Sequence, residues 1–158
     1  HRNKDSDTAL MIALLAEQDA KTVKVILESY ADGDRLSVLN YRNKEGNTAL
    51  MIASLRGRAE TVQVIIEACS NSDRLSALNH SNENGDTALM IASMWGRSEI
   101  VKVILEAYTD GDRLSALNHE NNEGNTALLI ASRKGDAKTV KVILETYPPS
   151  DRLSVLKH

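Results

Sequence analysis

One short string of residues recurs at a nearly constant interval along the whole chain. Thr48, Thr87 and Thr126 each begin the string Thr-Ala-Leu-(Met/Leu)-Ile-Ala-Ser, and successive copies are 39 residues apart (87 − 48 and 126 − 87). A fourth copy, without the serine, begins at Thr8, 40 residues before Thr48. A fixed period of about 30 to 40 residues indicates a solenoid, in which each unit buries its apolar face only against its neighbours. This pattern favours binding over catalysis as the kind of function.

Composition and charge narrow the class of protein. With 158 residues and 42% hydrophobic content, the chain has the make-up of an ordinary soluble globular protein. It has no apolar run long enough to span a bilayer and no amino terminus that resembles a signal peptide. The net charge is −3, with acids and bases interleaved, which argues against nucleic acid or an anionic membrane as the partner. Aromatic residues make up only 3% of the chain, so we expect an aliphatic core.

The chain contains one cysteine, Cys69, which excludes an internal disulfide and is compatible with a reducing compartment. Cys69 occupies the repeat position that holds Tyr30, Tyr108 and Tyr147 in the other copies. We therefore expect it to be a packing residue rather than a reactive thiol.

The chain begins and ends at the same point of the repeat. His1 and His158 occupy the position held by Tyr41, His80 and His119. We expect one repeat domain over residues 1–158, cut from a longer protein, with repeats at about 1–40, 41–79, 80–118 and 119–158. Because the outer repeats lack a neighbour on one side, part of their apolar surface should be exposed, and either further repeats or end-to-end contact between copies would cover it.

The second copy shows how one repeat is expected to fold. Residues 43–46 (Asn-Lys-Glu-Gly) have the composition of a turn. A short helix is predicted from Thr48 to about Arg56, and Gly57 supplies the left-handed residue that ends it. A second helix should begin near Ala59.

The apolar residues of this second helix lie on one helical face. Val62, Ile65, Ile66 and Cys69 fall at positions i, i+3, i+4 and i+7, and the same spacing recurs in every copy. Stacked side by side, these faces would form one continuous strip of core.

A third, brief helical turn is predicted in each repeat by the recurring stretch Asp-Arg-Leu-Ser. In the second copy, Ser72 or Asp73 can cap this turn. Leu75 and Leu78 are expected to share one side of it, and Asn79 can close it.

The order of turn, helix, glycine, second helix and return to the turn resembles the ankyrin repeat. Residues 46–57 are similar to the first helix of that family, and residues 62–68 are similar to the second. The resemblance covers the whole chain, and it implies an all-α, ankyrin-type helical repeat solenoid of four repeats. Each repeat would contain two helices, the extra helical turn and a finger turn.

The chain departs from the family pattern in several places. Ala49 stands where the family usually has proline, and Met51 stands where it often has histidine, so the family's Thr–His hydrogen bond cannot form. The period is 39 rather than about 33 residues, and the extra residues lie in the Asp-Arg-Leu-Ser segment. The first copy is further modified, with Ser6 in place of the turn glycine and residues 17–19 (Glu-Gln-Asp) in place of the helix-ending glycine.

The residues that end the first helix differ most between copies, so packing does not dictate them. In order, the pairs are Leu15 and Ala16, Leu55 and Arg56, Met94 and Trp95, and Arg133 and Lys134. The resemblance implies that these positions face a concave groove beside the finger tips. Trp95, the only tryptophan, stands where other copies have Ala, Arg and Lys, and with Met94 it has the composition of a binding hot spot. The alternative is that Trp95 lies flat over the adjacent repeat and only packs.

The finger turns would supply a polar rim to the same groove. The candidate rim residues are Lys44, Glu45, Asn47, Glu83, Asn84, Asp86, Asn122, Glu123 and Asn125. Many of them also fit simple solvated turn positions. Together with the helix ends, they predict a protein or peptide partner with an apolar anchor and some acidic character near the last repeat.

No catalytic, cofactor or metal site is expected. His80 and His119 share one repeat position, but stacked repeats lie about 10 Å apart, whereas zinc ligands lie about 2 Å from a shared ion. The stretch Asp-Arg-Leu-Ser recurs in every repeat. A structural element such as a capped helical turn has to be repeated in each unit, whereas a catalytic site does not, so we expect the stretch to be structural. The sequence contains no phosphate-binding glycine loop and no nucleophile elbow.

The sequence therefore predicts a non-enzymatic protein-interaction module, with a structural or consensus-engineered scaffold without a specific partner as the alternative. Ankyrin arrays occur in eukaryotic scaffolds and in effectors that intracellular bacteria deliver to their hosts. By this analogy alone, the resemblance implies a cytoplasmic location, which would be the host cytosol for a secreted effector.

Overall fold

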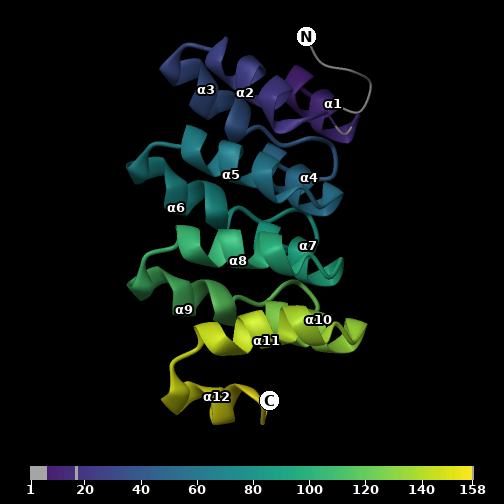
Figure 1. Cartoon of the computed structure of the whole chain (residues 1–158), viewed down its shortest axis with the longest axis vertical. Helices are drawn as coiled ribbons and strands as arrows, with labels where there is room; N and C mark the ends of the chain where they lie inside the picture. The colour runs from purple at the N-terminus through teal and green to yellow at the C-terminus, as the bar shows by residue number, and fades with distance from the viewer. Residues whose placement is uncertain (1–6, 17, 158) are drawn as a thin grey trace.

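The computed structural model describes residues 7–16 and 18–157, in which twelve helices follow one another in four groups of three (Figure 1). The first helices of the groups are α1 (Ala9–Leu15), α4 (Ala49–Arg56), α7 (Ala88–Met94) and α10 (Ala127–Lys134). The second helices are α2 (Ala20–Glu28), α5 (Ala59–Ala68), α8 (Ser98–Ala107) and α11 (Ala137–Thr146). The third helices are α3 (Asp32–Leu39), α6 (Asn71–Asn79), α9 (Asp110–Asn118) and α12 (Pro149–Val155). The expected all-α repeat solenoid is confirmed.

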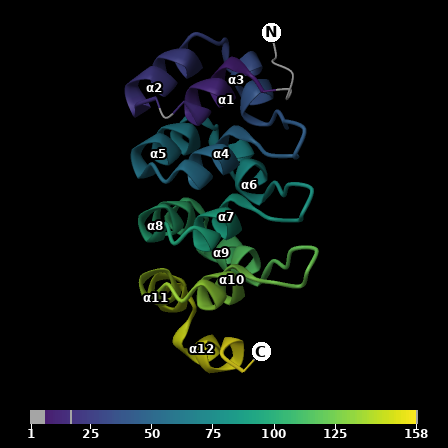
Figure 2. The ribbon, with the colours of Figure 1, turned by 90° about the vertical axis from the view of Figure 1, so that its right-hand side faces the viewer.

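The first and second helices of each repeat pack against the equivalent helices of the next repeat. Helices α1, α4, α7 and α10 contact one another in series, and helices α2, α5, α8 and α11 form a second series beside them. The repeats are therefore stacked along the long axis of the molecule, and the finger turns project from one side of the stack (Figure 2). Over the described residues, no helix is both long enough and apolar enough to cross a membrane.

The threonine of each repeat is the N-cap of the first helix. The hydroxyl of Thr48 accepts a hydrogen bond from the amide of Met51 at 3.5 Å, and Thr87 accepts one from Met90 at 3.4 Å. The amide of Thr48 in turn donates to the Met51 sulfur at 3.5 Å, so the thioether closes the capping box that a polar side chain closes in other proteins. Gly57 ends α4 with a φ of 77°, in the left-handed conformation predicted for it.

The predicted apolar face of the second helix forms the centre of the core. Val62, Ile65, Ile66 and Cys69 are all buried. At the two ends of the stack the same face is less covered, since Ile26 and Val140 are only half-buried. The core is thus one continuous strip that weakens toward the outer repeats.

The third helical segment is longer than the brief turn that the sequence predicts. Helix α6 has nine residues, and its N-cap is Ser70, which accepts a hydrogen bond from the amide of Asp73 at 3.3 Å. The expected cap at Ser72 or Asp73 is therefore wrong. Leu75 and Leu78 lie three residues apart in α6, as expected for one side of a helix, but only Leu78 is buried and Leu75 is exposed. The Ser6 turn of the first copy, as well as His1, Glu17 and His158, lie outside the described residues.

Candidate partner-binding surface

The ends of the first helices present a row of exposed side chains on adjacent repeats. Arg56 is the last residue of α4, Trp95 is the C-cap of α7, and Lys134 is the last residue of α10. All three are exposed. Because α4 packs on α7 and α7 packs on α10, the three positions lie on consecutive units of the stack, with Trp95 between the two cations.

Trp95 is the aromatic residue of this row, and 55% of its surface is accessible to solvent. The tyrosines that belong to the core behave differently, since Tyr108 and Tyr147 are buried. Tryptophan in the middle of a surface is unusual because its large apolar ring gains from being covered. More than half of the Trp95 side chain thus remains available for contact with another molecule.

The other members of the helix-end pairs are partly tied to the scaffold. Leu55 and Met94 are half-buried against the core. Arg133 is exposed, but its Nη2 donates to the Oδ1 of Asn125 at 2.8 Å, which turns its guanidinium toward the last finger. Of the six helix-end residues predicted to bind, Arg56, Trp95 and Lys134 are exposed at the ends of three consecutive first helices.

The finger residues fall into an exposed set and an inward set. Lys44, Glu45, Glu83, Asn84, Asn122 and Glu123 are exposed. Asn47 is half-buried, and Asp86 and Asn125 are buried. The last residue of each finger is therefore less exposed than the tip, and Asn47 and Asp86 turn toward the next repeat.

A ladder of side-chain hydrogen bonds explains the inward set. The Nδ2 of Asn82 donates to Asn47 Oδ1 at 3.1 Å. One repeat further on, the Nδ2 of Asn121 donates to Asp86 Oδ1 at 2.8 Å. Each donor asparagine also accepts two backbone amides of its own finger, as Asn82 does from Asn84 and Asp86 at 3.0 Å. Sequence reasoning treated the donors only as turn residues. The recurrence of asparagine at one position of all four copies (Asn3, Asn43, Asn82 and Asn121) was the signal for this ladder.

The finger backbones are also joined to one another. The amide of Glu83 donates to the carbonyl oxygen of Glu45 at 3.3 Å, and the amide of Asn122 donates to that of Asn84 at 3.0 Å. The Nδ2 of Asn122 adds a bond to the carbonyl oxygen of Glu83 at 2.8 Å. The exposed tips are thereby held at a constant spacing, and a surface that is already ordered loses less conformational entropy when it binds.

The repeated Asp-Arg-Leu-Ser stretch has a structural role that sequence analysis did not identify. The Nε of Arg113 in α9 donates to the carbonyl oxygen of Leu105 at 2.9 Å, and its Nη2 donates to that of Tyr108 at 3.1 Å. Arg35 makes the equivalent bonds at 3.0 and 3.3 Å. The last carbonyls of a helix lack partners within it, so in these two repeats the third helix holds the end of the second through this arginine.

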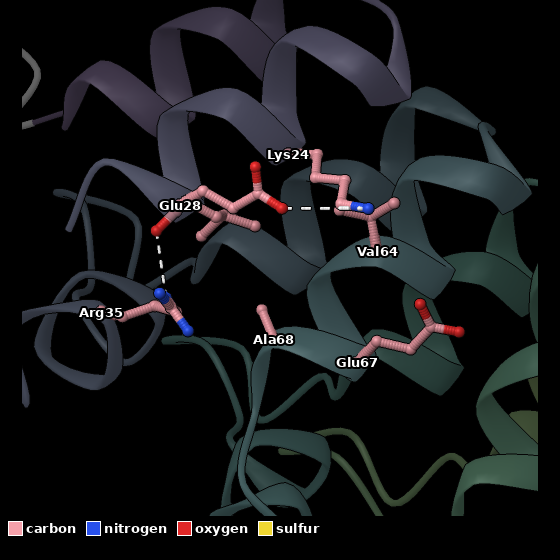
Figure 3. Close-up of a pocket in the computed structure, with 7 residues that line it drawn as sticks. Lys24, Glu28, Arg35, Val64, Glu67 and Ala68 are labelled. Carbon is pink, nitrogen blue, oxygen red and sulfur yellow. Dashed lines mark hydrogen bonds and ion pairs between the residues drawn. The ribbon is translucent and has the colours of Figure 1, made fainter. Parts of the chain in front are cut away.

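A surface hollow of about 220 Å³ lies beside this arginine in the first repeat (Figure 3). Lys24 and Glu28 of α2 form an ion pair at 3.8 Å on one wall, and Val64 and Glu67 of α5 form the other. An equivalent hollow of about 350 Å³ lies between α8 and α11. In this hollow the guanidinium of Arg35 is committed to the carbonyl oxygens of Leu27 and Tyr30.

Three of the groups with shifted pKa values are buried packing residues. Burial raises the pKa of Tyr108 and of Tyr147, whose hydroxyls donate to Asn79 and Asn118 of the preceding repeat at 2.9 and 3.3 Å. Burial also raises the pKa of Cys69, which keeps the thiol protonated and unreactive at neutral pH.

The two histidines that share a repeat position are engaged separately. His80 Nε2 lies 3.2 Å from Asn40 Oδ1, and burial, aided by Arg42, lowers the pKa of His80. His119 Nε2 lies 3.1 Å from the carbonyl oxygen of Gly85. In the part of the chain that the structure describes, no three His, Cys, Asp or Glu side chains gather into a group suited to a metal ion.

Comparison with known families agrees with this architecture. The family model of ankyrin repeats (3 copies) matches the chain in three overlapping stretches, at residues 1–74, 34–114 and 73–152. No individual curated protein matches the chain. The three stretches together cover residues 1–152, which include the threonine caps, the stacked helix pairs and the finger turns described above. The chain belongs to the ankyrin-repeat family.

Proposed function

We propose that this chain, without catalysing a reaction, binds a protein or peptide partner through Trp95 and the helix ends on either side of it. Ankyrin repeats are in general protein–protein interaction modules. The observation that carries the proposal is the 55% exposure of Trp95 at a repeat position where the fold has no need of an aromatic residue. Tryptophan is one of the residues enriched among binding hot spots.

The charges around Trp95 indicate the chemistry of the partner. Arg56 and Lys134 lie on the repeats before and after Trp95, so the row is basic although the whole chain carries a net charge of −3. A segment with an apolar or aromatic anchor and flanking acidic residues would match this row. Charge complementarity of this kind adds specificity and speeds association.

The finger tips would form the rim of the same surface. Lys44, Glu83 and Asn122 are exposed at successive tips, and the ladder of hydrogen bonds beneath them fixes their spacing. Asn47, Asp86 and Asn125 support the tips, and a contact from any of them to a partner remains a prediction.

The experiment is a comparison of wild type with two variants in a pull-down from whole-cell lysate. Trp95→Ala removes the apolar anchor, and the double variant Arg56→Glu/Lys134→Glu reverses the charge of the row. Each is expected to lose the protein that wild type retains, and isothermal titration with that purified protein should show a loss of at least about 30-fold for Trp95→Ala, the range of a hot spot. Leu75→Ala is the matched control, because Leu75 is also exposed but lies on a third helix.

All variants should keep the circular dichroism spectrum and the melting temperature of wild type. Equal retention by Trp95→Ala would contradict the proposed surface and move binding to the fingers or another face. If wild type retains no specific protein, the alternative of a structural or engineered scaffold without a partner is favoured. The near-identity of the four copies is the observation that keeps this alternative in view. For either role we propose a reducing, cytoplasmic setting, since the one cysteine is buried and unpaired with another thiol.

A further inference from the structure

The first turn of the second helix is closed by a carboxylate in two of the four repeats. In the last repeat, Asp136 caps α11 by accepting hydrogen bonds from the amide of Lys138 at 3.3 Å and from the hydroxyl of Thr139. In the first repeat, Asp19 caps α2 and accepts the amide of Thr22 at 2.8 Å. A carboxylate is favoured at this place because the first amides of a helix lack partners within it and carry partial positive charge.

The two middle repeats lack this carboxylate. The N-caps of α5 and α8 are Arg58 and Arg97, and neither side chain caps its helix. In α5 the hydroxyl of Thr61, the counterpart of Thr139, is buried and has no hydrogen-bond partner among the described residues. In α8, Ser98 is only 8% exposed, and its hydroxyl makes no hydrogen bond with a described residue. Polar groups at the start of both helices thus lack a partner of the kind that the outer repeats provide.

A hollow of about 240 Å³ lies at the start of α8. Arg97 and Ser98 line it from α8, Gly57 and Ala59 from the preceding repeat, and Lys138 from the following one. The guanidinium of Arg97 lies against Gly57, since a Cβ added there would be 2.6 Å from the Nε of Arg97. This guanidinium forms no hydrogen bond or ion pair with a described residue. The hollow therefore combines an uncapped helix start, a buried hydroxyl and an uncommitted cation.

The charges around the hollow favour an anion. Arg97 and Lys138 are positive, and Glu99 is the acidic residue among those that line it. Asp136 lies at the edge, where a Cβ added to Gly96 would be 3.0 Å from its Oδ2, but its carboxylate is committed to the first turn of α11. The amides at the start of α8 add partial positive charge. The planar fork of an arginine side chain also matches the two oxygens of a carboxylate.

We infer that the hollow at the start of α8 is a binding site for a carboxylate, supplied by an acidic side chain of the protein partner. The carboxylate would accept hydrogen bonds from the Ser98 hydroxyl, the first amides of α8 and the Arg97 guanidinium. It would thus do for α8 what Asp136 does for α11. Trp95 ends α7 directly before Gly96 and Arg97, so an acidic residue close to the apolar anchor of the partner would reach the hollow. The inference rests on the proposed function for the source of the carboxylate, and on the structure for the site.

The site is tested first on the chain alone, with acetate as the probe. Amide NMR signals are followed while sodium acetate is added, and sodium chloride at the same ionic strength is the reference. The amides of Ser98 and Glu99 should shift with acetate and saturate, with a dissociation constant on the order of 10 mM. They should not shift with chloride. A shift that does not saturate, or an equal shift with chloride, would overturn the inference.

Two variants test which groups hold the carboxylate. Arg97→Asp gives α8 the cap that α2 and α11 already have, so acetate binding should disappear and the melting temperature should rise. Lys138→Gln removes one exposed charge and should weaken acetate binding about two- to five-fold. Lys141→Gln is the matched control, because Lys141 is also exposed on α11 but pairs with Glu145 at 3.8 Å. Unchanged acetate binding by Arg97→Asp would contradict the site.

The same variants separate this inference from the proposed partner surface. Trp95→Ala should bind acetate as wild type does, because Trp95 does not line the hollow. If Trp95→Ala loses the captured protein but wild type does not bind acetate, the surface stands and the carboxylate site is overturned. If acetate binds but Trp95→Ala retains the protein, the site stands and the surface is overturned. Arg97→Asp should also capture less of the protein than wild type, and equal capture would exclude the partner as the source of the carboxylate.

Discussion

At the scale of single residues, the finger glycines show how one repeat position is used differently along the stack. Gly85 and Gly124 have nearly the same backbone conformation, with φ of 79° and 76°. A Cβ at Gly85 would lie 2.8 Å from the amide nitrogen of Asn122, whereas no described atom would lie within 4 Å of one at Gly124. A side chain at Gly85 is therefore disfavoured both by the left-handed backbone conformation and by contact with the next finger. A side chain at Gly124 is disfavoured by the backbone conformation alone.

We predict that Gly124→Ala lowers the free energy of unfolding by about 1–2 kcal/mol, the cost of a left-handed non-glycine residue. Gly85→Ala should cost on the order of 1–2 kcal/mol more, because the bond from the Asn122 amide to the Asn84 carbonyl must also be displaced. Urea unfolding of the two variants measures both values. Equal costs would show that the joined finger backbones do not contribute to stability.

The candidate site illustrates which residue properties a sequence reveals. Comparison of the copies identified Trp95 and Lys134 as positions that packing does not dictate, and both are exposed. The same comparison could not separate Glu83 from Asp86, because both are acidic residues of one turn. Their difference, one exposed and one buried in the ladder, depends on the asparagine of the following repeat. That contact joins residues 35 positions apart and has no local signature.

At the scale of secondary-structure elements, the third helix is the part of the repeat that local signals describe least well. The ends of α4 were predictable, because Thr48 and Gly57 are local start and stop signals. Helix α6 begins at Asn71, before the expected cap at Ser72 or Asp73. Its apolar face is short, since Ala77 and Leu78 are its only buried residues.

The arginine contact gives this element a test with an internal control. Arg113→Met keeps the apolar stem but removes the two bonds to the end of α8, so we expect a loss of about 1–3 kcal/mol in the free energy of unfolding. The equivalent Arg74 has its Nε buried without a hydrogen-bond partner among the described residues. Arg74→Met should therefore change the stability by less than about 0.5 kcal/mol or increase it.

Chemical denaturation followed by circular dichroism compares the two variants under one set of conditions. If Arg113→Met and Arg74→Met lower the free energy of unfolding by the same amount, the apolar stems rather than the hydrogen bonds of the guanidinium hold the third helix to the second. A larger cost for Arg74→Met would contradict the assignment of its Nε as unpaired.

At the scale of the whole molecule, stability is the sum of contacts between neighbouring repeats. The inner helices have neighbours on both sides, and α4 and α7 each bury six residues. Helix α12 buries none. The centre of the stack is therefore more stable than its ends, because each repeat contacts only its immediate neighbours.

Amide hydrogen exchange should show this gradient. We expect the slowest exchange in α4, α7 and α8, and exchange faster by orders of magnitude in α12, because local opening costs little where few apolar contacts are lost. The measurement is made by NMR. Uniform protection along the chain would indicate that all four repeats open as one cooperative unit.

The column of residues at the Met51 position has a consequence for chemical durability. Met11, Met51 and Met90 are buried in the stack, so an oxidant can reach their sulfurs only when repeats separate. Conversion to the sulfoxide would place a polar oxygen in the apolar core and hinder restacking. Oxidative damage would then accumulate at the rate at which the array opens. The one exposed member of the column is Leu129, which has no sulfur to oxidise.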